Sequence, residues 1–581
     1  MLTIMQSYAV SSMRNIYILL ILLLIFSGRV FAQTYTTTSG EIPPNRKVTN
    51  SNTQIKAVPV EFTSSNLPIV DINTNGATIP DDPKIRARLK IFYKGTGQRN
   101  AVTDVPEFDG YMGIEIRGSS SQSFPKKSFG FESWDAFGNS IDTSFLGMPA
   151  ESDWILNANY TDKSFIRNVM AYQVWQNLGH YATRYHFVEV ILNNQYQGIY
   201  IFSEKIKRDK NRVNIAKLSI TENSGDEVTG GYIFKIDKQT GSGGSGWTSS
   251  YQPSVSSGGQ HIFFQYEYPK DVDITTQQKS YLQGKVYEFE TALKSGNFTD
   301  TLNGFRKYAV ENTFIDYFLV NELSKNVDGY RLSTFINKER DSKGGKIRMG
   351  PVWDYDLAWH NADYCDGYIT SGWAYQFPCP DDYWQVPFWW SRLLEDPRYK
   401  NNLACRWQSL RQTTLSNAWF DHYIDSISGQ LMEAQQRNFI QWPILGIYVW
   451  PNPSPLATTY MGEVNALKIW MHNRLSWLDS NMPGNCDLSY GILETEAENI
   501  FTVYPNPVTD YLNIEFKSSD KNLFGILIIN QQGLILKNIK PTAQSSGQRS
   551  EALDISSYKP GVYLLRITIN GNMFTKRFIK I

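Results

Sequence analysis

The amino-acid sequence predicts an α+β fold for most of the chain, followed by a small C-terminal all-β sandwich. Residues from about 67 to 236 contain short strand-like stretches and one amphipathic helix, whereas residues from about 273 to 486 are mostly helical. After about residue 501, short alternating strands are separated by turn residues. A chain of 581 residues is also long enough for two or three domains.

The first part is built mainly from strands. Strand-like segments occupy residues 68–73, 87–93, 111–118, 126–132 and 230–237. Residues 162–179 predict an amphipathic helix, because Phe165, Ile166, Val169, Met170 and Val174 recur at helical spacing. Residues 186–206 predict a hairpin that turns at Asn193-Asn194 and ends at Glu204-Lys205.

The second part is built mainly from helices. Helical patterns occupy residues 280–296, 311–325, 389–415 and 461–481. A strand-rich first half with one helix, followed by a helical second half, matches the two-lobe layout of kinase-like folds.

Two acidic sites lie at the ends of a predicted hairpin in this second part. Asp328 precedes the strand RLSTFIN, and Asp354 and Asp356 follow the strand-like stretch KIRMGPVW. The two strands flank the charged, glycine-containing turn ERDSKGG, so the ends of the hairpin meet. Side chains two apart on a strand share a face, so Asp354 and Asp356 could point at one cation. A catalytic carboxylate beside a metal-holding carboxylate is what phosphoryl transfer of the kinase type needs.

Other interpretations of the acidic residues stay open. They could form a Ca²⁺ or salt-bridge site that only stabilises a loop. A glycoside hydrolase is a further alternative, because paired carboxylates and many aromatic residues occur in that class. The 56 basic and 56 acidic residues balance, so no nucleic-acid-binding surface is indicated.

The N-terminus predicts an export signal. Arg14 precedes the apolar run Ile16–Phe26, and Val30 and Ala32 stand before the expected cleavage site. We expect a signal peptide over residues 1–32, a mature chain that begins at Gln33, and a polar linker over residues 33–60. No other stretch reaches transmembrane length, so we expect no membrane span after cleavage.

Four cysteines, Cys365, Cys379, Cys405 and Cys486, allow three disulfide connectivities outside the cytosol. Only a short loop separates Cys365 from Cys379, immediately after the acidic motif. We therefore expect these two cysteines to be bonded to each other.

Residues 501–581 resemble the type A C-terminal sorting domain of the type IX secretion system of Bacteroidota. The matching features are YPNP at 504–507, the block LDISSYKPGVYLLRI and the terminal KRFIKI. The resemblance implies interaction with the type IX secretion machinery, and a secreted or outer-membrane, cell-surface location. Residues 487–500 would link this domain to the preceding one.

Residues from about 67 to 440 resemble the CotH spore-coat kinase family, which has an atypical kinase fold. The matching stretches are IRGSSSQSFPKKSFGFE, DWILNANYTDKSFIRNVMAY, VEVILNNQYQGIYIFSEKIK, NVDGYR and GPVWDYDLAW. The resemblance implies a kinase-like domain over residues 61–486, with an N-terminal β extension and a C-terminal helical region. It also implies phosphorylation of a protein Ser or Thr hydroxyl that depends on ATP and on Mg²⁺ or another divalent cation.

The resemblance assigns roles to particular residues. Asp328 takes the role of catalytic base, and Asp354, with Asp356 as a second ligand, takes the metal role. The residues implied in nucleotide binding are Arg117, Ser119, Ser120, Lys126, Lys127, Arg167 and Glu204. Of these, Arg117 and the serines would form the phosphate-side loop, one of the two lysines would contact a phosphate, and the backbone at Glu204 would meet adenine.

One position departs from the kinase pattern. Kinase catalytic loops place Asn five residues after the base to hold a second metal ion. Here that position is Ser333, a weaker ligand. A catalytically inactive surface, adhesion or matrix protein built on the same fold is therefore the alternative to an active kinase.

Overall fold

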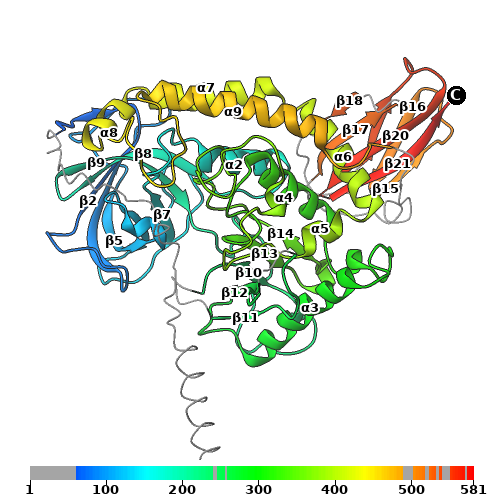
Figure 1. The fold of residues 1–581 in the computed structure, drawn as a ribbon, viewed down its shortest axis with the longest axis horizontal. Helices are drawn as coiled ribbons and strands as arrows, with labels where there is room; N and C mark the ends of the chain where they lie inside the picture. The colour runs from blue at the N-terminus through cyan, green and yellow to red at the C-terminus, as the bar shows by residue number, and fades with distance from the viewer. Residues whose placement is uncertain are drawn as a thin grey trace, which may run out of the picture. The chain divides into compact units, whose positions relative to one another are not determined.

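The computed structural model describes residues 60–239, 245–254, 258–487, 501–516, 523–530, 535–539, 550–569 and 572–581 (Figure 1). The predicted signal peptide and nearly all of both predicted linkers lie outside these residues. Within the part of the chain that the structure describes, no helix is both long enough and apolar enough to span a bilayer.

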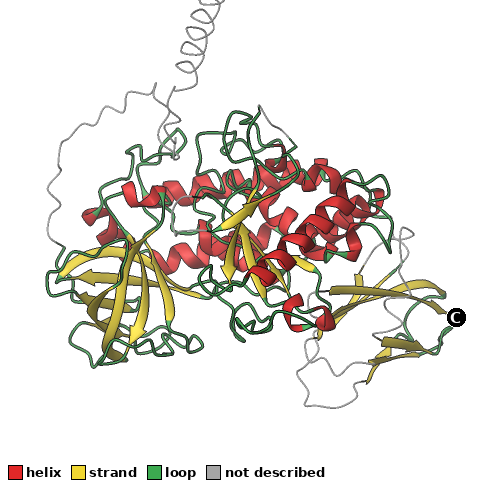
Figure 2. Ribbon diagram, turned by 90° about the horizontal axis from the view of Figure 1, so that it is seen from below, coloured by secondary structure: helices red, strands yellow, loops and turns green. Residues whose placement is uncertain are grey.

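Seven strands near the N-terminus close into a barrel in the order β2-β3-β5-β6-β7-β9-β8 (Figure 2). The strands are β2 (Ile69–Asn73), β3 (Ile85–Phe92), β5 (Phe108–Arg117), β6 (Ser128–Trp134), β7 (Asp153–Asn157), β8 (Tyr185–Leu192) and β9 (Gln195–Glu204). Alternate residues, such as Leu89, Ile114 and Phe131, point inward and form one apolar core. The four strands predicted before the helix are confirmed, and β7 was not recognised. Two short strands, β1 (Ser64–Ser65) and β4 (Asn100–Ala101), pair separately.

The predicted hairpin at residues 186–206 is confirmed as β8 and β9. Asn193 and Asn194 adopt φ angles of 51° and 63°. Asparagine tolerates this left-handed region, which two-residue hairpin turns require. The hairpin ends at Glu204, as predicted.

A second, five-stranded antiparallel sheet has the order β11-β12-β10-β13-β14. Its strands are β10 (Tyr232–Ile236), β11 (Gly246–Thr248), β12 (Phe263–Tyr268), β13 (Thr334–Lys338) and β14 (Ile347–Met349). The sheet thus combines strands from both halves of the sequence. The fold is mixed helix and sheet, and its halves are not separate strand and helix units.

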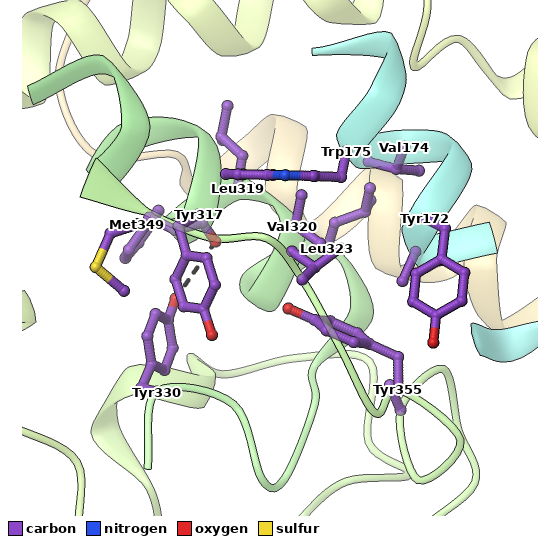
Figure 3. Packing of buried hydrophobic residues seen from close by; sticks show 14 of the residues in the cluster. Tyr172, Val174, Trp175, Tyr317, Leu319, Val320, Leu323, Tyr330, Met349 and Tyr355 are labelled. Atoms are coloured by element: carbon purple, nitrogen blue, oxygen red, sulfur yellow. Dashed lines mark hydrogen bonds between the residues drawn. The ribbon is translucent and has the colours of Figure 1, made fainter. Parts of the chain in front are cut away.

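Three helices pack around this sheet: α2 (Arg167–Asn177), α3 (Thr276–Lys294) and α4 (Glu311–Ser324). Helix α4 is buried over nearly its whole length, so apolar residues occur on all its sides, and its polar residues Asp316, Asn321 and Glu322 are buried as well. Figure 3 shows its core with α2, where Trp175 lies among Leu319, Val320 and Leu323.

The remaining helices are α5 (Trp389–Leu393), α6 (Pro397–Arg411), α7 (Asn417–Leu431), α8 (Ala434–Gln441) and α9 (Tyr460–Asn481). The predicted helical stretch 389–415 is thus two helices. The Asp396 side chain accepts a hydrogen bond from the backbone N–H of Arg398, and Pro397 occupies the first turn. Both features start a helix and prevent continuation from α5.

The C-terminal region forms the predicted β-sandwich. One sheet contains β15 (Phe501–Tyr504), β16 (Tyr511–Phe516) and β19 (Ser550–Asp554), and the other contains β17 (Leu523–Ile529), β18 (Ile535–Ile539), β20 (Gly561–Ile569) and β21 (Asn572–Lys580). Side chains of both sheets, including Leu512 and Leu565, share one core.

All four cysteines are paired. The predicted bond between Cys365 and Cys379 is confirmed, and Cys405 of α6 is bonded to Cys486.

Candidate functional site

The hairpin β13–β14 brings its two acidic ends together, as predicted. Ile336 pairs with Met349 in an antiparallel register, so Asp328 before β13 and the loop after β14 lie at the same end. The charge of Asp328 reaches both Asp354 and Asp356 and raises the pKa of each. The three carboxylates therefore form one electrostatic cluster.

The two aspartates after β14 are presented in a different way from that predicted. Residues 351–358 are not a strand, and Asp354 has a left-handed φ of 66°. Instead, Tyr355 between them is anchored in the core. Its N–H donates to Asn168 Oδ1 at 2.6 Å and its hydroxyl donates to Asn321 Oδ1 at 3.0 Å. Figure 3 shows Tyr355 below the apolar side chains of α4. Asp354, the preceding residue, is exposed.

Backbone strain is concentrated in the two loops of the cluster. Tyr330, Ser333 and Asp354 have φ angles of 70°, 47° and 66°. Non-glycine residues adopt this region only where surrounding contacts hold them, and such positions are frequent at functional sites. Ser333 Oγ donates to Asp354 Oδ2 at 3.3 Å. The residue that departs from the kinase pattern therefore contacts the candidate metal ligand Asp354 directly.

A buried arginine orients Asp328. Arg331 lies 2.8 Å from the Asp328 carboxylate, and its side chain is only 2% exposed. The same guanidinium donates to the carbonyl of Trp384 at 3.1 Å and lies 3.3 Å from Asp382. Asp328 is thereby tied to the segment that follows the Cys365–Cys379 disulfide.

The cluster carries an excess of negative charge. Although the Asp354 side chain reaches solvent, desolvation by its crowded surroundings and then the charges of Asp328 and Asp237 raise its pKa, against the effect of Arg117. Burial, Asp354 and Asp162 hold the pKa of Asp356 well above its usual range. Repulsion of this kind is relieved by a bound cation.

Sequence reasoning missed two of these carboxylates, Asp237 and Asp162. Asp237 follows β10 directly, and its place at a strand end was the signal that could have identified it. Asp162 is fully buried and is ion-paired with Arg167 at 2.5 Å. The sequence pattern offers no comparable signal for Asp162.

Arg117 is the predicted nucleotide residue that the structure places nearest this chemistry. It ends β5, its guanidinium lies over the Trp353 ring at 5.5 Å, and its charge interacts with that of Asp354. Ser119 and Ser120 follow it in an exposed loop, which turns at Gly118 with a φ of 108°. Lys127 stabilises this loop, because its Nζ donates to the carbonyl of Gln122 at 2.5 Å.

Three other predicted nucleotide residues, Lys126, Arg167 and Glu204, make internal contacts. Lys126 Nζ donates to Ile199 O at 2.5 Å and to Asn438 Oδ1 at 3.1 Å, and burial holds its pKa well below the usual range. A buried lysine with these partners is a structural group and is not presented to a phosphate. Arg167, beside Asp162, donates to the carbonyl of Trp359 at 3.2 Å.

The backbone at Glu204, which was predicted to meet adenine, lies within the barrel. Its N–H donates to the carbonyl of Arg184 at 3.1 Å. Its side chain is fully buried and lies 2.6 Å from the Arg184 guanidinium and 3.6 Å from that of Arg212. Glu204 therefore holds the barrel end together.

The carboxylate oxygens of this site suit a cation that keeps water or substrate oxygens as ligands in addition to those of the protein. Among the described residues, no three His, Cys, Asp or Glu side chains form a group that could hold a metal ion alone. Mg²⁺ is bound through one or two carboxylates, with water and substrate phosphates completing its octahedron. Asp354 and Asp356 supply oxygen donors of that kind.

The mixed helix-and-sheet fold and its acidic cluster are consistent with a kinase-like fold. A family model described as CotH kinase protein matches residues 114–478, which is more than half of the chain. The protein therefore belongs to the CotH kinase protein family. A second model, the secretion system C-terminal sorting domain, matches residues 502–581. No curated protein matches the chain.

The sorting domain indicates the location of the protein. Its presence indicates export by the type IX secretion machinery to the cell surface or the medium. The two disulfides are consistent with such an oxidising location.

Proposed function

We propose that this protein is a secreted CotH-like kinase that transfers the γ-phosphoryl group of ATP to Ser or Thr hydroxyls of a protein substrate. The observation that supports this most directly is the cluster of Asp328, Asp354 and Asp356, with Arg117 beside it. Such a cluster combines a base, oxygen ligands for a divalent cation and a phosphate-binding cation.

Each residue has a distinct role in the proposed reaction. Asp354 and Asp356 hold Mg²⁺ or another divalent cation, which offsets the charge of the phosphates when it is bound. Arg117 contacts the phosphates, and the loop at Ser119 and Ser120 offers hydroxyls and N–H groups to them. These contacts position the γ-phosphorus in line with the acceptor.

Asp328 acts on the acceptor hydroxyl. It accepts the hydroxyl proton as the acceptor oxygen bonds to the γ-phosphorus, and the bond from that phosphorus to the β–γ bridging oxygen breaks, releasing ADP. Arg331 keeps the carboxylate in place at 2.8 Å. The Asp328 carboxylate is therefore the proton acceptor.

Two isosteric variants separate binding from chemistry. Asp354→Asn is expected to abolish Mg²⁺-dependent ATP binding in calorimetry, because it removes a cation ligand and its charge. Asp328→Asn is expected to leave binding largely intact and to lower ³²P transfer by about 10²-fold or more. The effect of Asp356→Asn on ATP binding and on ³²P transfer should lie between the effects of these two variants. If the wild-type protein binds no nucleotide with any divalent cation, the kinase proposal is wrong.

The alternative is a catalytically inactive surface, adhesion or matrix protein. Ser333 favours it, because a hydroxyl already engaged with Asp354 is a poor replacement for the usual amide ligand. ATP binding without detectable transfer to any tested protein would support this alternative.

A further inference from the structure

Asn168 of α2 contacts the loop that carries the two proposed cation ligands. It lies in the first turn of the helix and is buried. Its Oδ1 accepts a hydrogen bond from the N–H of Tyr355 at 2.6 Å, so the Nδ2 end of the carboxamide carries the two donor hydrogens. The two ends of one carboxamide are about 2.3 Å apart, which places Nδ2 within about 5 Å of the Tyr355 nitrogen.

The donor end of Asn168 has no acceptor. Nδ2 is buried and forms no hydrogen bond with any residue that the structure describes. Buried amide groups almost always have a partner in folded proteins, and an unpaired one destabilises the fold. An acceptor for this donor is therefore expected in the functional state of the protein.

The carboxylate of Asp356 has the complementary deficit. Asp354 accepts a hydrogen bond from Ser333 Oγ, whereas within the described part of the chain no other residue donates to the Asp356 carboxylate. The bond from Asn361 Nδ2, at 2.7 Å, goes to the backbone carbonyl of Asp356. Carboxylates that bind metal ions are themselves held by hydrogen bonds from neighbouring groups. An acceptor without a donor thus directly follows the residue that Asn168 already binds.

We propose that Asn168 is a positioning residue for Asp356, and that its Nδ2 donates to the Asp356 carboxylate when this carboxylate binds a divalent cation. A rotation of the Asp356 side chain brings the two groups together, while the bond from Tyr355 to Oδ1 keeps the backbone in place. Because Nδ2 is buried, a dissolved phosphate does not reach it, and the acceptor comes from the chain itself. The inference rests on the proposed function for one point, the role of Asp356 as a cation ligand.

The test measures Mn²⁺ affinity by calorimetry without nucleotide, so that no phosphate contributes. Asn168→Ala is expected to lower the affinity about tenfold, as when a partner of a metal ligand is removed. Asp356→Ala should lower it at least as much. Adding Asn168→Ala to Asp356→Ala should change it less than about twofold, because the donor then has no carboxylate to hold.

Asn452→Ala is the matched control. Asn452 is also a buried asparagine with one unpaired atom, Oδ1. Its Nδ2 donates to the carbonyl of Thr161 and to Asn361 Oδ1, each at 2.9 Å, and not to Tyr355 or Asp356. This variant should leave the Mn²⁺ affinity unchanged.

A crystal of the wild-type protein soaked with Mn²⁺ and ADP gives a second readout that needs no variant. Nδ2 should lie about 3 Å from an Asp356 carboxylate oxygen, and a separation of more than about 4 Å with Mn²⁺ bound would overturn the inference. The kinase proposal would stand in that case.

Two results of the titrations would also overturn the inference without affecting the kinase proposal. One is an Asn168→Ala variant that keeps wild-type Mn²⁺ affinity, including a variant that loses ATP affinity alone, which would assign Nδ2 to a phosphate. The other is an equal loss of Mn²⁺ affinity with and without the Asp356 carboxylate. If wild-type protein binds neither Mn²⁺ nor ATP with a divalent cation, the kinase proposal itself fails.

Discussion

Opening the Cys365–Cys379 disulfide should disturb both stability and the acidic site. The bond closes a loop with a sequence separation of 14 residues. In the chain-entropy treatment a loop of this length contributes about 3 kcal/mol to the free energy of unfolding. We expect the double variant Cys365→Ser, Cys379→Ser to lose roughly that amount in urea denaturation.

The effect should reach Asp328 through the segment that the disulfide restrains. Phe377 of the loop lies under the Arg331 guanidinium at 4.2 Å, and Asp382 and Trp384 bind the same group. Arg331 in turn orients Asp328. Loosening these contacts should lower phosphoryl transfer by about tenfold, with little change in ATP affinity.

The second disulfide is the control. Cys405–Cys486 has a sequence separation of 81 residues, so its loss should cost about 4.5 kcal/mol in the same treatment. The contacts that hold Arg331 come from Val327, Phe377, Asp382 and Trp384 and not from these cysteines, so transfer by the folded fraction should not change. Equal loss of transfer in both double variants, or wild-type transfer in the Cys365 and Cys379 variant, would refute the coupling to Asp328.

Three other substitutions probe the core and the site. Burial raises the pKa of Glu290 to about 7, from an unfolded value near 4.5, so the contribution of this group to stability should be greatest below about pH 4.5 and should be lost as the pH rises to about 7. The decline is at most about 3 kcal/mol, and urea denaturation from pH 4 to 8 should show that Glu290→Gln removes it. Tyr355→Phe leaves Asn321 Oδ1 without its hydroxyl donor and should cost about 1–2 kcal/mol in the same assay, whereas the exposed control Tyr383→Phe should cost almost nothing. Ser333→Asn should raise turnover, because asparagine tolerates the φ of 47° and returns an amide oxygen beside Asp354; unchanged kcat would show that Ser333 does not limit the reaction.

The features that sequence could predict are those with local signals. The Asn193-Asn194 turn, the apolar pattern of α4 and the β13–β14 hairpin each depend on neighbouring residues. Closure of the barrel depends instead on the parallel pairing of β2 with β8, in which Ile69 meets Glu189. These residues are far apart in the sequence, and no short sequence pattern predicts their contact.

The candidate site shows the same limit at the level of side chains. The proximity of Asp328 to Asp354 followed from the hairpin, but the left-handed backbone at Asp354 did not. Adjacent lysines on a strand point to opposite faces, so sequence left Lys126 and Lys127 undecided. The structure buries Lys126 against Asn438, a residue that only the folded chain brings near.

The first turns of α2 and the acidic loop are held together as one unit. Besides the bond from Tyr355 to Asn168, the Trp359 indole donates to the carbonyl of Arg167 at 3.1 Å, and Arg167 returns a bond to the carbonyl of Trp359. Tyr172, one turn further, stacks on Trp353 with ring centroids 5.8 Å apart. Contacts therefore exist on both sides of Asp354 and Asp356. Because each contact fixes backbone or a flanking ring, a shift of α2 would displace both carboxylates together, and the placement of Asp354 and Asp356 depends on α2 as much as on the hairpin.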